Sequence, residues 1–150
     1  MKNNRATLRV LLDTSFILPS LGIDVGEVVN KGLKKISDIE AEIYYSSFSI
    51  LESLWVAARL EKDATNIDRV DLGLRSVMES SRYKEIREDS EIFIKALEMH
   101  KLGHRDFVDN ILYSTSIILN LKLLTVDKGL KEFIAAKRLT DTLMHPDQIG

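Results

Sequence analysis

Residues 8–15, Leu-Arg-Val-Leu-Leu-Asp-Thr-Ser, join a short aliphatic run to an aspartate. The run predicts a buried β-strand over Leu8–Leu12, because it is too short for a helix and rich in branched apolar side chains. Asp13 then lies where this strand passes into a short helix, which we expect over Thr14–Leu21. Aspartate is also a favoured helix N-cap, so structure and function explain this single position equally well.

The same arrangement recurs near the other end of the chain. Residues 122–126 (KLLTV) predict another strand, and Asp127 follows it directly, with Thr125 two residues earlier. The carboxyl ends of parallel strands meet at one edge of a sheet, where α/β proteins bind ligands. Like charges brought together there cost free energy unless a cation neutralises them. The two aspartates therefore predict a metal site.

Strands and helices alternate between these two stretches. Further strands are expected over Glu42–Ser46 and Tyr83–Ile86, with an edge strand at Leu143–Met144. Helical periodicity predicts helices over 25–36, Ser47–Lys62 with Ser47 as N-cap, Ala64–Ser80, Ser90–Leu102, Arg105–Asn120 and Lys128–Lys137. This alternation indicates an α/β fold with a mainly parallel sheet. The 150 residues contain only two prolines and no linker or repeat, so we expect one domain over residues 1–150.

Composition narrows the class of protein. The chain has no cysteine, which excludes disulfides and thiolate ligands and suits the cytoplasm, where we expect the protein. A net charge of −2 argues against a protein that coats nucleic acid, but not against an enzyme whose acidic pocket binds cations. The polar segment Met1–Arg9 is unlike a signal peptide, and Ile111–Leu121 is shorter than the roughly 20 residues of a membrane span. We therefore expect a soluble protein.

A third acid, Glu52, lies in the apolar and small-residue stretch SILESLWVAA. The apolar stripe of this helix is expected to comprise Phe48, Leu51, Leu54, Trp55 and Ala58. Glu52 would then lie at the edge of the buried stripe. A solvent-facing glutamate is the simpler interpretation, but a surface helix face would normally carry further charges.

Two more acids, Asp106 and Asp109, are three residues apart at the start of a predicted helix and share one of its faces. Acids in a first turn are favoured by the helix dipole, and Asp106 is explained as an N-cap. Asp109 is one turn further in and needs another explanation.

The ligand types select the metal. Carboxylates without cysteine favour hard cations such as Mg²⁺ or Mn²⁺, and the scattered His100, His104 and His145 argue against zinc. Carboxylates that hold two hard cations ~4 Å apart commonly catalyse phosphodiester hydrolysis. One cation activates a water molecule, and the other stabilises the leaving oxygen.

Four motifs in order resemble PIN domains: LLDTS (11–15), LESLW (51–55), DFVDNILYSTSI (106–117) and LLTVDKGL (123–130). The resemblance spans nearly the whole chain. It implies a three-layer α/β/α sandwich around a mainly parallel sheet, and a Mg²⁺- or Mn²⁺-dependent endoribonuclease.

The resemblance also assigns roles to residues. Asp13, Glu52, Asp109 and Asp127 match the catalytic metal ligands, and Asp106 matches an accessory acid that only some members have. Ser15 and Thr125 match hydroxyl positions that support the site by hydrogen bonding. The candidates for binding substrate phosphates are Arg105 and Lys128, which adjoin the acids in sequence, together with Arg59, Arg82, Lys84, Arg87, His104 and Lys131.

Many small PIN domains are toxins of the VapC type, whose antitoxin inserts a segment over the active site, and members are often homodimers. The size of the chain favours the toxin interpretation by analogy, and the apolar helices around Trp55 and 70–78 are a candidate dimer surface. The alternatives are an RNA-processing PIN nuclease outside a toxin–antitoxin pair and a catalytically inactive PIN scaffold. A phosphoacceptor receiver domain is a rival from another class, but it requires an acid pair where Leu12 precedes Asp13.

Overall fold

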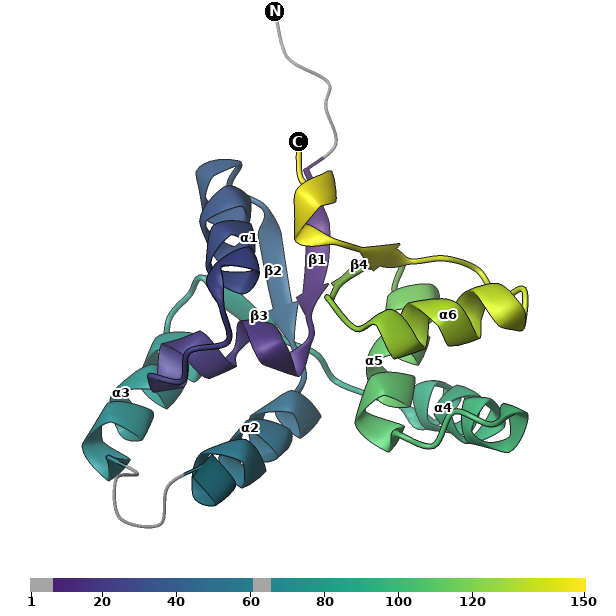
Figure 1. The fold of residues 1–150 in the computed structure, drawn as a ribbon, viewed down its shortest axis with the longest axis horizontal. Coiled ribbons are helices and arrows are strands. Elements are labelled where there is room, and N and C mark those ends of the chain that lie inside the picture. The colour runs from purple at the N-terminus through teal and green to yellow at the C-terminus, as the bar shows by residue number, and fades with distance from the viewer. Residues whose placement is uncertain (1–6, 61–65) are drawn as a thin grey trace, which may run out of the picture.

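A computed structural model describes residues 7–60 and 66–150, which fold around a central sheet (Figure 1). Within these residues the sheet has five strands in the order β3-β2-β1-β4-β5. The strands are β1 (Arg9–Leu12), β2 (Glu42–Tyr45), β3 (Tyr83–Glu85), β4 (Lys122–Leu124) and β5 (Leu143–Met144). Every pairing is parallel, and β5 forms the expected edge strand. A receiver domain has the strand order 2-1-3-4-5, so the observed order excludes that rival.

The helices follow the predicted segments to within a few residues. They are α1 (Glu27–Asp38), α2 (Ser47–Leu60), α3 (Ile67–Met78), α4 (Ser90–Leu102), α5 (Phe107–Ile118) and α6 (Lys128–Ala136). The predicted helix ends at Lys62 and Ala64 lie outside the described residues. The described residues also form three short 3-10 helices, η1 (Thr14–Phe16), η2 (Leu18–Leu21) and η3 (Pro146–Gln148).

The predicted helix over Thr14–Leu21 is in fact the two 3-10 helices η1 and η2. Their hydrogen bonds join residues three apart, from Ile17 N–H to the Thr14 carbonyl and from Ser20 N–H to the Ile17 carbonyl. Pro19, near the start of η2, has no N–H to donate to an α-helical ladder. The chain therefore turns tightly after β1 and keeps the residues that follow Asp13 at the edge of the sheet.

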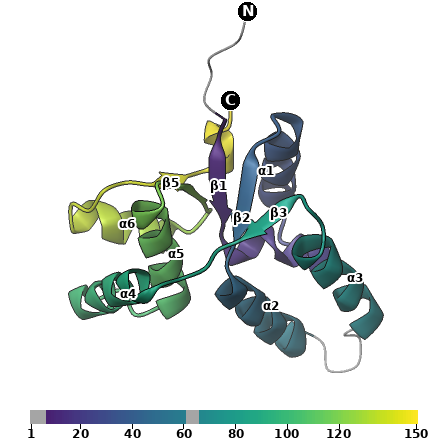
Figure 2. The ribbon, with the colours of Figure 1, turned by 180° about the vertical axis from the view of Figure 1, so that it is seen from behind.

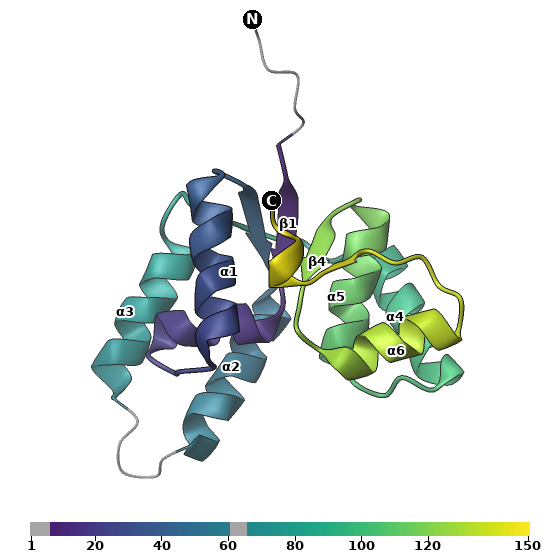
Figure 3. The same ribbon diagram turned by 45° about the horizontal axis from the view of Figure 1, so that its top comes forward.

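Alternate side chains of β1 point to opposite faces of the sheet and pack into two hydrophobic cores. Val10 and Leu12 pack with apolar residues of α1 and α3, including Ile36 and Val77. Leu11 points to the opposite face, where it packs in a core with residues of α4, α5 and α6. Figures 2 and 3 show these two groups of helices on the two sides of the sheet. The result is the predicted three-layer α/β/α sandwich.

Helix α2 begins one residue after the side chain that caps it. The Ser46 hydroxyl accepts a hydrogen bond of 3.1 Å from Phe48 N–H, and the Ser46 carbonyl accepts from Ser49 and Ile50. The predicted cap, Ser47, is exposed and is the first helical residue. Ser46 is therefore the N-cap, because a cap residue lies outside the helix and binds its free N–H groups.

The predicted apolar stripe of α2 was wrong. Leu51, Leu54 and Trp55 are 43%, 39% and 57% exposed, and Ala58 is exposed as well, whereas Phe48 is half-buried. The buried face instead consists of Ser49, Ile50, Ser53 and Ala57. This face packs on η1 and α5, and small side chains allow a closer approach there than leucine or tryptophan would. The Ser53 hydroxyl loses little by burial because it donates to the Ser49 carbonyl at 2.7 Å.

Among the described residues, no helix is long and apolar enough to span a membrane. All five strands run in the same direction, so their carboxyl ends share one edge. Helix α2 begins two residues after β2 ends, and η1 begins two residues after β1 ends. Figure 1 shows both at this edge of the sheet.

Candidate active site

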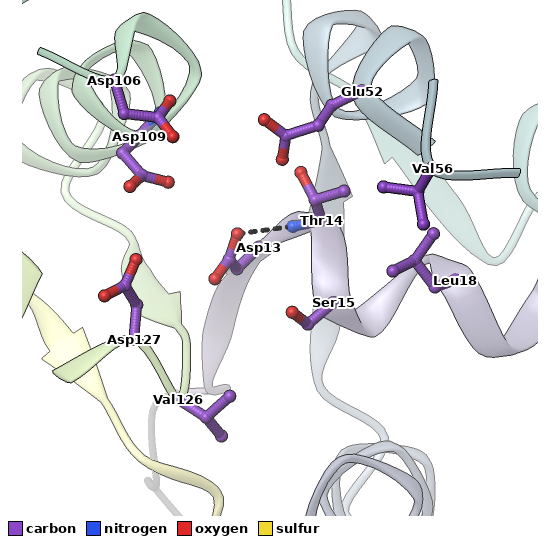
Figure 4. A pocket seen from close by; sticks show the side chains of 10 residues that line it. All are labelled: Asp13, Thr14, Ser15, Leu18, Glu52, Val56, Asp106, Asp109, Val126 and Asp127. Carbon is purple, nitrogen blue, oxygen red and sulfur yellow. Dashed lines mark hydrogen bonds between the residues drawn. The ribbon is translucent and has the colours of Figure 1, made fainter. Parts of the chain in front are cut away.

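An acidic pocket of about 330 Å³ opens at the carboxyl edge of the sheet (Figure 4). Its lining consists of Asp13, Thr14, Ser15, Leu18, Glu52, Val56, Asp106, Asp109, Val126 and Asp127. The five acids come from four separate parts of the chain, and Figure 4 shows their carboxylates on the walls of one space. The fold thus brings together all the acids that the sequence singled out.

Asp13 is held on both carboxylate oxygens. Its Oδ1 accepts a hydrogen bond of 2.6 Å from Thr14 N–H, and its Oδ2 accepts one of 2.7 Å from the Thr125 hydroxyl. Burial raises the pKa of Asp13 to about 6, although these two hydrogen bonds lower it. The charges of Asp127 and Glu52 contribute smaller increases to this pKa. Asp13 is therefore a fixed carboxylate in a poorly solvated, negatively charged place.

Asp109 is buried and surrounded by the other four acids of the pocket. The residue as a whole is only 9% exposed to solvent. Burial, followed by the charges of Asp13, Asp106, Asp127 and Glu52, raises its pKa to about 9. Asp109 is consequently protonated at neutral pH when no cation is bound. Four acids acting on a fifth is an arrangement that a cation would stabilise.

Asp106 and Asp127 both cap helices. Asp106 Oδ1 accepts from Asp109 N–H at 3.1 Å, which confirms its expected role as the N-cap of α5. Asp127 Oδ1 accepts from Leu130 N–H at 3.1 Å and caps α6. Each cap uses one carboxylate oxygen, so the other oxygen of each side chain is left for a ligand in the pocket.

Thr125 connects two of the acids. Its hydroxyl donates to Asp13 and accepts a hydrogen bond of 3.0 Å from Asp127 N–H. The predicted supporting role of Thr125 thus has a defined geometry. Ser15, the other predicted supporting hydroxyl, is half-buried and lines the pocket.

Sequence reasoning missed a paired histidine and asparagine behind Asp109. His104 Nδ1 lies 2.7 Å from Asn110 Oδ1, and Asn110 Nδ2 donates to the His104 carbonyl at 2.7 Å. Because an amide oxygen only accepts, Nδ1 carries the hydrogen and donates. The other ring nitrogen, Nε2, lies 4.0 Å from Asp109 Oδ2. Asn110 is completely buried and follows Asp109 directly, but nothing in a single sequence distinguishes a buried helical asparagine from an exposed one.

The predicted basic residues are spread over several surfaces. Lys128 and Lys131 line a neighbouring pocket of about 180 Å³ that shares Val126 and Asp127 with the acidic pocket. Arg59 lines another neighbouring pocket. Arg105 is exposed and does not line the acidic pocket.

Two of the predicted basic residues contact aromatic rings rather than the acidic pocket. Arg82 lies over the ring of Tyr83, and Lys84 lies over the ring of Tyr44.

The donor set fits a hard cation by its chemistry. Within residues 7–60 and 66–150, no three acidic or histidine side chains are close enough to hold an ion as they stand. All the pocket's acidic donors are nevertheless carboxylate oxygens, which Mg²⁺ and Mn²⁺ prefer. Thr14 also lines the pocket, and its hydroxyl is buried without a hydrogen-bond partner among the described residues. The burial and acidic surroundings that raise the pKa of Asp109 and this unpaired oxygen both favour a bound cation.

The fold and the pocket define an α/β sandwich with an acidic site at the carboxyl edge of a parallel sheet. The chain matches the PIN domain family over residues 10–135 and belongs to that family. No curated protein matches it.

Two solved structures are similar in fold. A toxin–antitoxin complex from Klebsiella pneumoniae contains a chain with a TM-score of 0.61 and 14% identity, and the match covers 91% of this chain and 97% of that one. VapBC2 from Rickettsia felis, bound to a DNA fragment from its promoter, gives a TM-score of 0.59 and 18% identity over 90% and 96% of the two chains.

Proposed function

We propose that this protein is a metal-dependent endoribonuclease that hydrolyses RNA phosphodiester bonds with bound Mg²⁺ or Mn²⁺. The observation that carries the proposal is the convergence of Asp13, Glu52, Asp109 and Asp127 on one pocket. Burial, together with the charges of the neighbouring acids, raises the pKa of Asp109 to about 9, a cost that is hard to explain in a purely structural site. Membership of a family of nucleases supports the same conclusion.

In this proposal the four carboxylates hold the cations, with Asp106 as an accessory ligand. Bound cations would supply an activated water molecule and stabilise the leaving oxygen. Thr125 and the Thr14 backbone orient the Asp13 carboxylate through hydrogen bonds to its two oxygens. The His104–Asn110 pair supports the wall of the pocket behind Asp109.

The substrate would be held by basic residues on the rim. Lys128 follows Asp127 directly at the start of α6 and lines the adjoining pocket, so its ammonium group can bind a phosphate beside the acids. Arg105 directly precedes the cap of α5 and is exposed. Both cations would offset the negative charge that the RNA backbone brings to an acidic pocket.

We further propose that the protein is the cytoplasmic toxin of a toxin–antitoxin pair. The support is the similarity in fold to chains of two such complexes. A cognate antitoxin would then be the regulatory partner. A homodimer is also proposed, because α2 and α3 expose Leu51, Ile67 and Met78 to solvent and such apolar surfaces are often interfaces.

The decisive experiment is cleavage of a mixed structured RNA pool by the purified protein with Mn²⁺ or Mg²⁺. The controls are EDTA and Asp13→Asn, which removes a charge with almost no change in volume. Cleavage that is absent from both controls supports the proposal, whereas cleavage that persists in either rejects the site. No cleavage together with no Mn²⁺ binding in calorimetry would instead identify a catalytically inactive scaffold.

A second experiment separates a toxin from an RNA-processing nuclease. Induced expression in a bacterial host should arrest growth with the unaltered chain and not with Asp13→Asn. Cleavage in vitro without growth arrest would favour the RNA-processing alternative.

A further inference from the structure

A second pocket adjoins the acidic pocket on the side of α2. This side pocket has a volume of about 610 Å³ and is lined by Glu52, Trp55, Val56, Ala58, Arg59 and Asp106. Glu52, Val56 and Asp106 line the acidic pocket as well. The two pockets therefore adjoin, and a molecule that lies in one can reach the other.

One face of α2 leads from the acids into the side pocket. Glu52, Val56 and Arg59 are spaced four and then three residues apart, and Trp55 lies beside them three residues after Glu52. Residues at these spacings share a helix face. Glu52 and Arg59 are separated by about 10 Å along the helix axis at 1.5 Å per residue. Figure 4 shows Glu52 and Val56 of this face directed into the acidic pocket.

Trp55 and Arg59 are both available for a ligand. Trp55 is the single tryptophan of the chain and is 57% exposed. Within the described residues it makes no ring stacking or cation–π contact, and Arg59 is exposed and has no ion-pair partner there. An exposed indole plane is a platform on which any nucleobase can stack, and a guanidinium group binds phosphate with two hydrogen bonds.

We propose that the side pocket is a nucleotide subsite, in which Trp55 stacks on an unpaired base of single-stranded RNA and Arg59 binds a phosphate of the same strand. The proposal rests on the proposed nuclease function, because it assigns the neighbouring part of that substrate. In this proposal Trp55 determines specificity. A base that is paired and stacked in a duplex cannot swing out to stack on the indole ring of Trp55, whereas an unpaired base can. Cleavage is then directed to single-stranded positions.

RNA fits this pocket better than a protein partner does. Leu51 and Leu54 are the other large exposed apolar residues in the middle of α2, yet neither lines the side pocket. The pocket combines one aromatic plane with one arginine at the border of the acidic site. That combination matches a base and its phosphate, whereas a partner that covers the apolar surface of α2 would also use the two leucines.

The single tryptophan permits a direct test. The Asp13→Asn protein is titrated with a single-stranded oligoribonucleotide, with an abasic strand of equal length and with a duplex, all with Mg²⁺ present. Binding is followed by the anisotropy of labelled RNA, and stacking by the fluorescence of Trp55. We expect saturable quenching by the single strand, and no quenching by the abasic strand or the duplex.

Variants in the Asp13→Asn background give a matched comparison. Trp55→Ala should weaken single-strand binding by about 5- to 150-fold, the range for loss of one base–aromatic stack, and Trp55→Phe should retain most of the affinity. Arg59→Ala should weaken binding and reduce its dependence on salt concentration. Leu54→Ala, on the same helix but outside the side pocket, is the control and should bind as tightly as Asp13→Asn alone.

The outcomes separate this subsite from the proposed function. RNA binding with unchanged tryptophan fluorescence and unchanged Trp55→Ala affinity would overturn the subsite and leave the nuclease proposal intact. Absence of all RNA binding would overturn both. If light scattering shows that Trp55→Ala dissociates a dimer while RNA affinity is unchanged, Trp55 belongs to a protein interface and the subsite is wrong.

Discussion

The Thr125 hydroxyl donates a hydrogen bond of 2.7 Å to Asp13 Oδ2, joining residues that are 112 positions apart. The same hydroxyl accepts from Asp127 N–H. Thr125, which directly follows β4, therefore holds both the Asp13 carboxylate after β1 and the backbone of Asp127 before α6. The pairing of β1 with β4 in the centre of the sheet makes this contact possible.

We expect Thr125→Val to reduce cleavage most strongly at acidic pH. The Thr125 hydrogen bond lowers the pKa of Asp13, so its loss raises that pKa and protonates the carboxylate over a wider pH range. The acidic limb of the kcat/KM profile should move to higher pH. Thr125→Ser keeps a hydroxyl and should restore the original limb, whereas identical profiles for Thr125→Val and the unaltered protein would disprove this role.

Asp109 should make the metal-free protein less stable as pH rises. Its pKa is 3.8 when unperturbed and about 9 in the folded protein, so between these values the folded state binds more protons than the unfolded state. Stability then falls with increasing pH across this window. Asp13, with a folded pKa of about 6, adds to the decline in the lower part of the window.

The comparison with Asp109→Asn isolates this contribution. Asparagine cannot ionise, so the variant should lose less stability with pH, by at most about 1.4 kcal/mol per pH unit for the one group removed. Urea unfolding in EDTA, from about pH 5 to 8.5, measures both curves. The same variant should be inactive in cleavage. Parallel stability curves would mean that Asp109 ionises normally in the folded protein.

The aspartates at strand ends could be predicted from sequence because their positions depend on local pattern. An aliphatic run followed by an acid identifies both Asp13 and Asp127, and parallel topology then brings them to one edge. Glu52 and Asp109, in contrast, were assigned to the site by the resemblance of their motifs to PIN domains, and they line the same pocket. For the strand-end aspartates, the local sequence and the chain topology contain the necessary information.

The buried face of α2 could not be predicted in the same way. Hydrophobicity favoured Leu51, Leu54 and Trp55, but the structure buries Ser49 and Ser53 instead. The choice depends on how closely α2 approaches η1 and α5, which is a tertiary property. The His104–Asn110 pair depends on the same kind of information, since its hydrogen bonds arise from the turn between α4 and α5.

Divalent cations should stabilise the protein, with a larger effect at higher pH. Protons compete with the cation for the carboxylates, so binding strengthens as Asp13 and Asp109 ionise. Mg²⁺ or Mn²⁺ at 100 times its dissociation constant would add about 2.7 kcal/mol and raise Tm by about 5–10 °C. Scanning fluorimetry at two pH values measures the shift. Asp109→Asn should show a smaller metal-induced shift in Tm. The absence of any Tm shift at millimolar Mg²⁺ or Mn²⁺ would contradict a carboxylate metal site.

Gly73→Ala should destabilise the fold without touching the site. A Cβ at this position of α3 would lie 2.1 Å from the Ser20 carbonyl oxygen and 2.9 Å from Leu21 Cδ2, so α3 must move away from η2. Overpacking of this kind costs about 1–3 kcal/mol or more. Leu72→Ala, at a neighbouring residue that is 64% exposed, is the control and should change urea stability by less than about 0.5 kcal/mol. Equal stabilities would contradict the close contact.

Two substitutions of Asp127 separate its structural role from its chemical one. Asparagine keeps the oxygen that accepts from Leu130 N–H, so Asp127→Asn should preserve the start of α6 and the urea stability while abolishing cleavage. Asp127→Ala removes both the cap and the charge, and should also cost about 1 kcal/mol. Asp106→Asn keeps the cap of α5 in the same way, and its effect on cleavage should be milder because Asp106 is exposed.

If Asp127→Asn cleaves RNA as well as the unaltered protein, the charge of Asp127 is not needed and its conformation alone matters. The metal would then depend on Asp13, Glu52 and Asp109. If both Asp127 variants are inactive but only the alanine variant is destabilised, capping and catalysis are independent functions of one carboxylate. Its two oxygens make that division possible, since Oδ1 binds the helix N–H group and Oδ2 is left for the pocket.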